Sequence, residues 1–293
     1  MNKSLVLGFF DGVHKAHKAV INSAFEFSDN VTLITFKDSP ALYFGQKAEY
    51  ILSRQNSIEK IKKLGVKEVV ELDFPKIANM EAEEYIKYLI DTYHPISIST
   101  GFNHTFGRNK KGNSEFLKDN QNKYGYKYIC IPPEKDSNDV ISSTLIKKYL
   151  CEGNVEKADN LLESNFVLEG IVIHGAKIGR TIGFPTANIK YPEGIVKLPY
   201  GVYGVNVINY PLPQALSGMD RVCCAIMNWG MKPTVHNTIE PIVEVHILNF
   251  DGDLYGKNIR IEVLKQIRAE RKFENLEELK VQIKKDIKQC LEL

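Results

Sequence analysis

The stretch LVLGFFDGVHKAH, residues 5–17, decides the fold of the first half of the chain. It begins with a short apolar strand, turns at Gly8, and continues into a helix that opens with His14 and His17. In open α/β sheets, ligands bind beyond the carboxyl ends of the strands, where helix N-termini offer free N–H groups to anions. The two histidines are three residues apart and fall on one helical face, so both can donate hydrogen bonds to phosphate oxygens. Taken alone, they are equally compatible with two surface histidines at the start of an ordinary helix.

Outward from this stretch, short β-branched runs alternate with longer helical patterns as far as about residue 164. This alternation is typical of a Rossmann-like α/β domain, a parallel sheet covered by helices. The predicted strands are residues 5–7, 31–36, 68–72, 96–100 and 126–131. The predicted helices, which carry apolar residues three and four apart, are residues 53–64, 81–93 and 115–124.

Beyond Asn165 the pattern changes to closely spaced strands broken by Gly, Pro and Asn, which predicts a small antiparallel β-barrel. Its predicted strands are residues 168–174, 203–209, 222–228, 242–249 and 258–263. A helix closes the chain, with Asn275 as N-cap and Glu278 at its third position. The helix is predicted to lie against the barrel through Leu276, Leu279, Ile283 and Ile287. We therefore expect two domains, residues 1–164 and 165–293.

Length and composition agree with two ordinary globular domains, because 293 residues exceed the size at which one core stops growing. A net charge of +2 lacks the positive excess of a nucleic-acid binder, and no apolar run is long enough for a membrane span. No signal segment precedes the first strand. Five cysteines without a CxxC pair disfavour a disulfide framework and a zinc site. We expect a cytoplasmic monomer or transient oligomer, with the lysines between residues 60 and 63 and between 284 and 288 exposed to solvent.

A second informative stretch is GAKIGRTIGFPTAN, residues 175–188. Its glycines are not spaced like a Walker loop, but they can bring backbone N–H groups close to phosphates as an anion nest. Thr186 and Asn188, two apart in an extended segment, present oxygens on the same side, which suits a magnesium ion that keeps several waters. For the glycines alone, a glycine-rich hairpin loop is the simpler interpretation.

Taken together, these motifs resemble one known family, the prokaryotic bifunctional riboflavin kinases/FAD synthetases, whose first domain is an HxGH nucleotidyltransferase. In the first half, GFNHTFG (101–107) is similar to the family's Gly-x-Asn-Phe-x-Phe-Gly, and ISSTLIK (141–147) to its Ile-Ser-Ser-Thr-x-Ile-Arg. In the second half, GFPTAN (183–188) is similar to the riboflavin kinase signature, and RAERKF (268–273) to Arg-Pro-Glu-x-x-Phe. The resemblance covers nearly the whole chain.

For the first half, the resemblance implies an FMN adenylyltransferase in which His14 and His17 are catalytic. It also implies ATP binding by Gly8, Phe9, Asn103, Ser143, Thr144 and Lys147, and flavin binding by Pro40 and Asn103. Without that context, Ser-Ser-Thr before a helix is more often a cap than a phosphate site. The sequence departs from the family pattern at Phe9, Ala16 and Lys147, and residues 35–40 lack one proline.

For the second half, the resemblance implies a riboflavin kinase in which Glu244 is the general base for the ribityl 5′-hydroxyl. A strand glutamate between two valines otherwise faces solvent in most cases. Thr186 and Asn188 are implied to coordinate Mg-ATP, and the other ATP-binding residues are Gly175, Gly179, Arg180 and Gly183. Arg268 and Arg271 are implied to bind flavin, with Ala269 replacing a proline.

The predicted function is thus bifunctional. Riboflavin and ATP give FMN and ADP, then FMN and ATP give FAD and pyrophosphate, both with Mg²⁺. The expected partners are these small molecules, with no nucleic acid and no membrane. One alternative is that a single activity remains, or that reduced flavin is preferred. Another is a non-catalytic flavin-binding regulator of transcription.

Overall fold

The computed structural model describes residues 2–175, 178–208, 222–233 and 239–293. Contacts divide the chain into two compact units, Met1–Leu145 and Ile146–Leu293. This division lies N-terminal to residue 164, where the sequence pattern changes. The reason is α8 (Val155–Leu162), which packs on β8 (Phe166–Ile173) and β13 (Asn258–Ala269) of the second unit.

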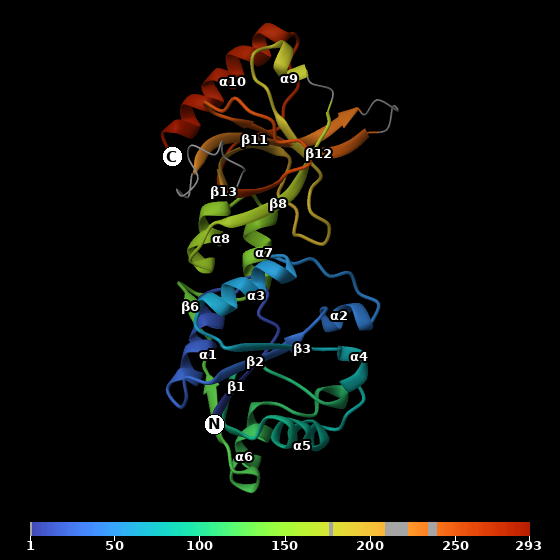
Figure 1. Cartoon of the computed structure of the whole chain (residues 1–293), viewed down its shortest axis with the longest axis vertical. Coiled ribbons are helices and arrows are strands. Elements are labelled where there is room, and N and C mark those ends of the chain that lie inside the picture. The colour runs from blue at the N-terminus through green and yellow to red at the C-terminus, as the bar shows by residue number, and fades with distance from the viewer. Residues whose placement is uncertain (1, 176–177, 209–221, 234–238) are drawn as a thin grey trace. The chain divides into compact units, whose positions relative to one another are not determined.

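The first unit is built on a five-stranded sheet of order β3-β2-β1-β4-β5 (Figure 1). All four strand pairs are parallel, which confirms the predicted α/β fold. Each strand coincides closely with its predicted range; the bounds are β1 Lys3–Leu7, β2 Val31–Phe36, β3 Glu68–Leu72, β4 Pro95–Gly101 and β5 Lys127–Ile131. The chain order reverses at β1, which pairs with β2 on one side and β4 on the other. A reversal of this kind opens a crevice at the carboxyl ends of the strands.

Helices cover both faces of this sheet. On one face, α1 (Lys15–Phe25) and α3 (Arg54–Lys63) share a core with Val6 of β1. On the other face, α5 (Ala82–Tyr93) and α6 (Ser114–Tyr124) share a core with Leu5 and Leu7. Successive side chains of β1 point to opposite faces of the sheet, so this strand contributes to both cores. Shorter elements are α2 (Pro40–Tyr43), α4 (Phe74–Ile77), η1 (Arg108–Lys110), β6 (Lys135–Asp136) and β7 (Asp139–Val140).

The second unit is a closed six-stranded barrel of order β10-β11-β12-β9-β8-β13. Every pair is antiparallel, which confirms the predicted barrel. The remaining bounds are β9 Ala187–Ile189, β10 Gly201–Ile208, β11 Cys223–Pro233 and β12 Ile239–Ile247. β9 was expected only as extended chain, and β11 and β13 run further than predicted. Residue 209, the last of one predicted strand, lies outside the described residues.

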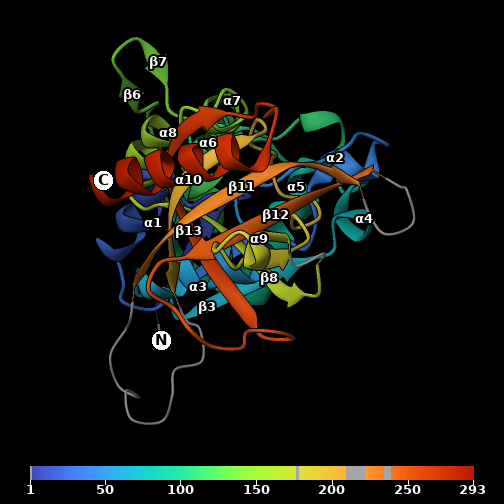
Figure 2. The ribbon, with the colours of Figure 1, turned by 90° about the horizontal axis from the view of Figure 1, so that it is seen from above.

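The C-terminal helix α10 (Leu276–Leu291) packs on the outside of the barrel against β10, β11 and β13 (Figure 2). Asn275 is its N-cap as predicted, because its side chain accepts a hydrogen bond from the Glu278 N–H at 2.9 Å. Ile283 and Ile287 pack on the barrel. The prediction for Leu276 is wrong: this side chain is 55% exposed, because the packed face begins one turn later. Two further helices are α7 (Ser143–Cys151) and α9 (Ile178–Thr181).

Over the described ranges, no helix combines the length and the apolar character that crossing a membrane requires.

Candidate active sites

A cavity of about 410 Å³ lies in the first unit at the carboxyl ends of β1 and β4. This is the crevice expected from the reversal of strand order. Its lining includes the predicted residues Gly8, Phe9, His14, His17, Asn103, Ser143 and Thr144, and also Ala16. Among the residues that the structure describes, Lys147 and Pro40 do not line it. The structure thus brings together one group of predicted residues and leaves two outside.

The turn after β1, residues 8–13, is held in an unusual conformation. Phe10, Gly12 and Val13 have positive φ values of 59°, 82° and 48°. For a β-branched residue such as Val13 this is a true outlier, and such strain persists only where the surroundings enforce it. The Asp11 carboxylate accepts from the Ile51 N–H at 2.8 Å, and the Ser143 hydroxyl donates to the Asp11 carbonyl at 2.9 Å. Strained turns of this kind concentrate at ligand sites.

His14 and His17 stack on each other, with ring centroids 3.6 Å apart and planes 18° apart. His14 is the N-cap of α1 rather than a residue of the helix, and its Nδ1 accepts from the His17 N–H at 3.4 Å. In the neutral ring the proton therefore sits on Nε2, where it can be donated to a ligand. Burial lowers the pKa of His14 to about 4, and the positive charge of Lys60 adds to this effect.

The pKa of His17 is lowered as well, first by burial and then by the charges of His14 and Lys60. Both rings are thus neutral hydrogen-bond donors at pH 7.

The sequence allowed the residues at the start of α7 to be either a helix cap or a phosphate site. Ser142 is a cap, because its hydroxyl accepts from the Leu145 N–H at 3.2 Å. Ser143 contacts the turn after β1, and Thr144 is an exposed residue on the cavity wall. Phosphate binding by Ser143 and Thr144 stays a prediction.

Sequence reasoning missed two side chains in this region. Lys60 was expected to be solvent-exposed, but it is half-buried and its Nζ donates to the Gly12 carbonyl at 3.1 Å. Its long alkyl stem lets the charge reach inward from a helix surface, which periodicity does not reveal. His104 lines the cavity at the place where the family segment has a phenylalanine, so this residue did have a signal in the sequence.

In the second unit, strand register brings the predicted kinase residues together. Glu244 on β12 is the direct partner of Asn188 on β9 and of Asn228 on β11. Directly opposed residues place their side chains on the same face of a sheet. Thr186 lies two residues before Asn188 and lines the same cavity as Glu244. The structure therefore places the predicted base beside the predicted magnesium ligands.

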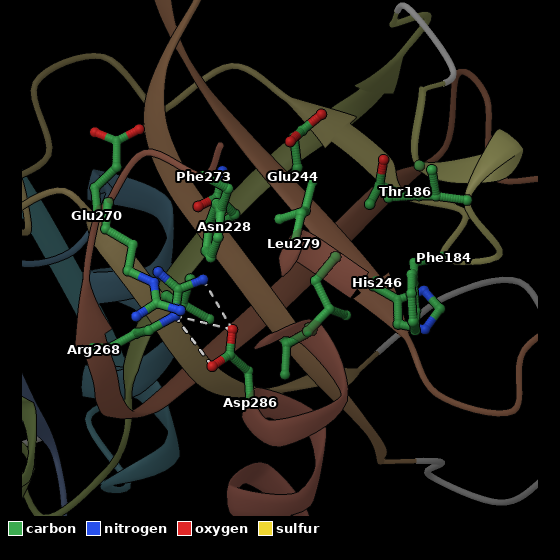
Figure 3. A pocket seen from close by; sticks show the side chains of 16 residues that line it. Phe184, Thr186, Asn228, Glu244, His246, Arg268, Glu270, Phe273, Leu279 and Asp286 are labelled. Atoms are coloured by element: carbon green, nitrogen blue, oxygen red, sulfur yellow. Dashed lines mark hydrogen bonds and ion pairs between the residues drawn. The ribbon is translucent and has the colours of Figure 1, made fainter. Parts of the chain in front are cut away.

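This cavity has a volume of about 240 Å³ and lies between the barrel and α10. Figure 3 shows Glu244 and Thr186 on one side of it and the Arg268–Asp286 contact on the other. Its apolar walls are formed by Ile182, Phe184, Val202, Ile226, Leu279 and Ile283. Arg271 and Gly179, also predicted, line the cavity as well. Apolar walls with a few converging polar groups are typical of small-molecule sites.

A neighbouring cavity of about 610 Å³ is lined by Arg180 and by the loop between β12 and β13, which carries Asp251, Asp253 and Tyr255. This loop is not the predicted hairpin, because β12 and β13 do not pair with each other. Thr186 lines both cavities. This side chain therefore stands where the contents of the two cavities would meet.

The two predicted flavin-binding arginines are tethered to α10. Arg268 contacts Asp286 through Nε at 3.1 and 3.0 Å and through Nη2 at 2.9 Å, and Asp286 is only 1% exposed. Arg271 donates to the Gln282 side chain at 2.7 Å. Both guanidinium groups lie near the Phe273 ring, at 5.5 and 4.7 Å from its centroid. Asp286 and Gln282 were not predicted, because in the sequence both residues are polar positions of a surface helix.

The glycine loop packs closely on the residues it precedes. A Cβ atom on Gly175 would lie 2.5 Å from the Asn188 side-chain nitrogen, so this position has no room for a side chain. Gly183 has a φ of 89° and open space around it. Residues 176 and 177, in the middle of the predicted phosphate loop, lie outside the described residues.

His246, which was not predicted, holds the chain just before Thr186. Its Nδ1 lies 2.7 Å from the Pro185 carbonyl, and its ring meets Phe184 edge to face.

The first unit is a parallel sheet with a crevice suited to phosphates, and the second is a closed barrel with two adjoining cavities. Together they define a transferase with two nucleotide-dependent sites. Residues 1–145 match the family model for FAD synthetase, and residues 162–293 match the family model for riboflavin kinase. The chain belongs to the family of bifunctional riboflavin kinase/FMN adenylyltransferases.

Relatives over nearly the whole chain support this assignment. The bifunctional riboflavin kinase/FMN adenylyltransferase of Bacillus subtilis is 33% identical, over 98% of this chain and 91% of the relative. The protein of the same name from Escherichia coli K12 is 31% identical, over 96% and 90%. A crystal structure from Streptococcus pneumoniae, described as a macrolide-efflux protein, matches with a TM-score of 0.86 and 32% identity, over 98% and 93%.

Proposed function

We propose that the chain makes FAD from riboflavin in two steps, one in each unit. The barrel unit, residues 165–293 with the helices that pack on it, phosphorylates riboflavin to FMN. The sheet unit, within residues 1–164, adenylylates FMN to FAD. The observation that carries this proposal is the pairing of Glu244 with Asn188 in the barrel. Thr186, two residues before Asn188, lines both cavities of this unit. The same chain holds His14 and His17 in a separate crevice.

In the kinase step, the riboflavin 5′-hydroxyl oxygen bonds to the γ-phosphorus of ATP. The bond from that phosphorus to the β,γ-bridging oxygen breaks, and ADP leaves. Glu244 accepts the hydroxyl proton, a role that needs only modest basicity because phosphoryl transfer depends mainly on positioning and charge stabilisation. The apolar 240 Å³ cavity suits the flavin ring, and the 610 Å³ cavity suits the nucleotide.

The side-chain chemistry around Glu244 fits a magnesium ion. Thr186, Asn188 and Glu244 offer hydroxyl, amide and carboxylate oxygens, the hard ligands that Mg²⁺ prefers. Thr186 and Asn188 would hold the ion, which neutralises phosphate charge when it is bound with ATP. Glu244 then remains available for the proton.

In the adenylylation step, a phosphate oxygen of FMN bonds to the α-phosphorus of a second ATP, and pyrophosphate leaves with the α,β-bridging oxygen. The FMN phosphate is already an anion, so this step needs no protein base. His14 and His17 donate hydrogen bonds from neutral rings to the charge that builds on the leaving group. Gly8, Asn103 and Thr144 bound the same crevice and position the substrates.

We also propose that these reactions take place in the cytoplasm, in a monomer or transient oligomer that binds no nucleic acid. All five cysteines are free, which supports a reducing compartment. The near-neutral charge gives no basis for binding nucleic acid.

The test is to incubate the purified chain with Mg-ATP and either riboflavin or FMN, and to separate the products by chromatography. We expect FMN and then FAD from riboflavin, and FAD and pyrophosphate from FMN. Failure to form FAD from FMN under both oxidising and reducing conditions would contradict the bifunctional proposal. Formation of FAD only under reducing conditions would show a preference for reduced flavin.

A further inference from the structure

Lys60 contacts the turn that borders the crevice of the sheet unit, although it does not line the crevice itself. It lies on α3, the helix that shares a core with α1, and its Nζ donates to the Gly12 carbonyl at 3.1 Å. Lys62 and Lys63 on the same helix are exposed. One lysine of this basic run therefore points inward while its neighbours remain in solvent.

The carbonyl that Lys60 contacts belongs to the strained turn after β1. Gly12 lies between Asp11 and Val13, and Val13 has a φ of 48°, a strained conformation for a β-branched residue. Groups from distant segments hold this turn, among them the Ile51 N–H and the Ser143 hydroxyl on Asp11, the Thr35 hydroxyl on Phe9, and Lys60 on Gly12. Lys60 is the cation among these groups. The contact that fixes the turn thus also brings a positive charge to the start of α1.

The charge of Lys60 reaches the catalytic pair. It lowers the pKa of both His14 and His17, in addition to the larger effect of burial. The charges that act on these two rings are those of Lys60 and, for His17, of His14; the Asp11 carboxylate is the acid of the same turn. At pH 7 the two rings are neutral.

We propose that Lys60 is a positioning residue for adenylyl transfer, which fixes the turn after β1 through Gly12 and brings a cationic side chain to the start of α1. This inference rests on the proposed function of the sheet unit. A fixed cation stabilises the developing pyrophosphate charge without requiring either histidine to be protonated. The histidines can then act as neutral donors over a wide pH range.

The test compares Lys60→Met, Lys60→Arg and the exposed control Lys62→Met with the unaltered chain. For Lys60→Met we expect FMN adenylylation to fall roughly 10- to 100-fold in kcat/KM for ATP at pH 8. The loss should be of similar size at pH 6, because burial keeps both His14 and His17 neutral there even without the neighbouring cation. Lys60→Arg should retain most activity, and Lys62→Met should match the unaltered chain. Riboflavin phosphorylation should be unchanged in all of them.

An NMR titration of the histidines gives a second readout that does not depend on activity. We expect the pKa of both His14 and His17 to be higher in Lys60→Met than in the unaltered chain. The inference is overturned if adenylylation is unaffected in Lys60→Met, or if it falls while the histidine titrations stay the same. It is also overturned if Lys60→Arg loses as much as Lys60→Met. An unaltered chain that makes no FAD would contradict the proposed function instead, and the titration would still test the role of Lys60.

Discussion

At the scale of single residues, burial of the His104 imidazole makes the stability of the fold depend on pH. Its Nε2 is buried without a hydrogen-bond partner within the part of the chain that the structure describes. Its ring stacks on Phe106 with centroids 5.8 Å apart. Burial lowers the pKa of His104 to about 4, so the ring is neutral in the folded protein at any pH well above that value.

This depressed pKa predicts a specific loss of stability in acid. In the unfolded chain His104 titrates near 6.5, so between pH 6.5 and pH 4 the unfolded state binds the extra proton and folding weakens as the pH falls. From pH 7.5 to pH 5 this effect should cost about 2 kcal/mol. Urea unfolding of the unaltered chain and of His104→Phe at both pH values measures it. The difference in unfolding free energy between the two proteins should shift by about that amount in favour of His104→Phe. An identical pH dependence would mean that His104 does not titrate in this range.

Elements set the next scale, and α10 is the element that completes the kinase cavity. Its apolar residues Leu279 and Ile283 form one wall, and Asp286 fixes Arg268 at the same wall. Because Asp286 is almost fully buried, its charge depends on Arg268 for compensation. The helix therefore both closes the cavity and orients a cation in it.

Asp286→Asn should weaken both the docking of α10 and the binding of flavin. We expect a loss of about 2 kcal/mol in unfolding free energy, less than the ~3–5 kcal/mol of a fully buried pair, since the Arg268 side chain remains 19% exposed. The KM for riboflavin should rise, because Arg268 loses its fixed orientation. Glu277→Gln, which removes the exposed partner of Lys280 on the same helix, is the matched control and should change neither quantity. Equal unfolding curves for the two variants would argue against a structural role of Asp286.

The glycine loop before β9 provides a second test at this scale. Gly175→Ala would place a methyl group against the Asn188 amide and displace it from Glu244, its register partner. We expect riboflavin phosphorylation to fall on the order of 10- to 100-fold, because small misplacements at a reacting centre are costly. FMN adenylylation serves as the internal control and should be unchanged. Full kinase activity in this variant would show that the position of Asn188 is not critical.

For the whole molecule, the fold was largely predictable because its signals are periodic. Alternating strands and helices indicated the parallel sheet, and closely spaced strands indicated the barrel. The sites were predictable only where motifs mark them. No local signal pairs Glu244 with Asn188, because register depends on the closure of the whole barrel. Lys60 acts on Gly12, 48 residues away, and the length of its side chain hides that contact from any pattern. The prediction for Leu276 was wrong because the apolar periodicity of the helix begins one turn before the face that packs on the barrel.

The two units each have their own core and their own candidate site, so the two activities should separate by mutation. FMN is the product of one proposed reaction and the substrate of the other. A chain that is defective in one unit should therefore be complemented by a chain that is defective in the other.

The most direct measurement follows FAD formation from riboflavin and Mg-ATP by Glu244→Gln, by the double variant His14→Ala/His17→Ala, and by an equal mixture of the two. We expect Glu244→Gln to make almost no FMN from riboflavin but to convert added FMN to FAD. The histidine variant should stop at FMN, and the mixture should form FAD. Two separate sites joined by FMN would be contradicted if either variant alone made FAD from riboflavin at the normal rate, or if either variant lost both activities.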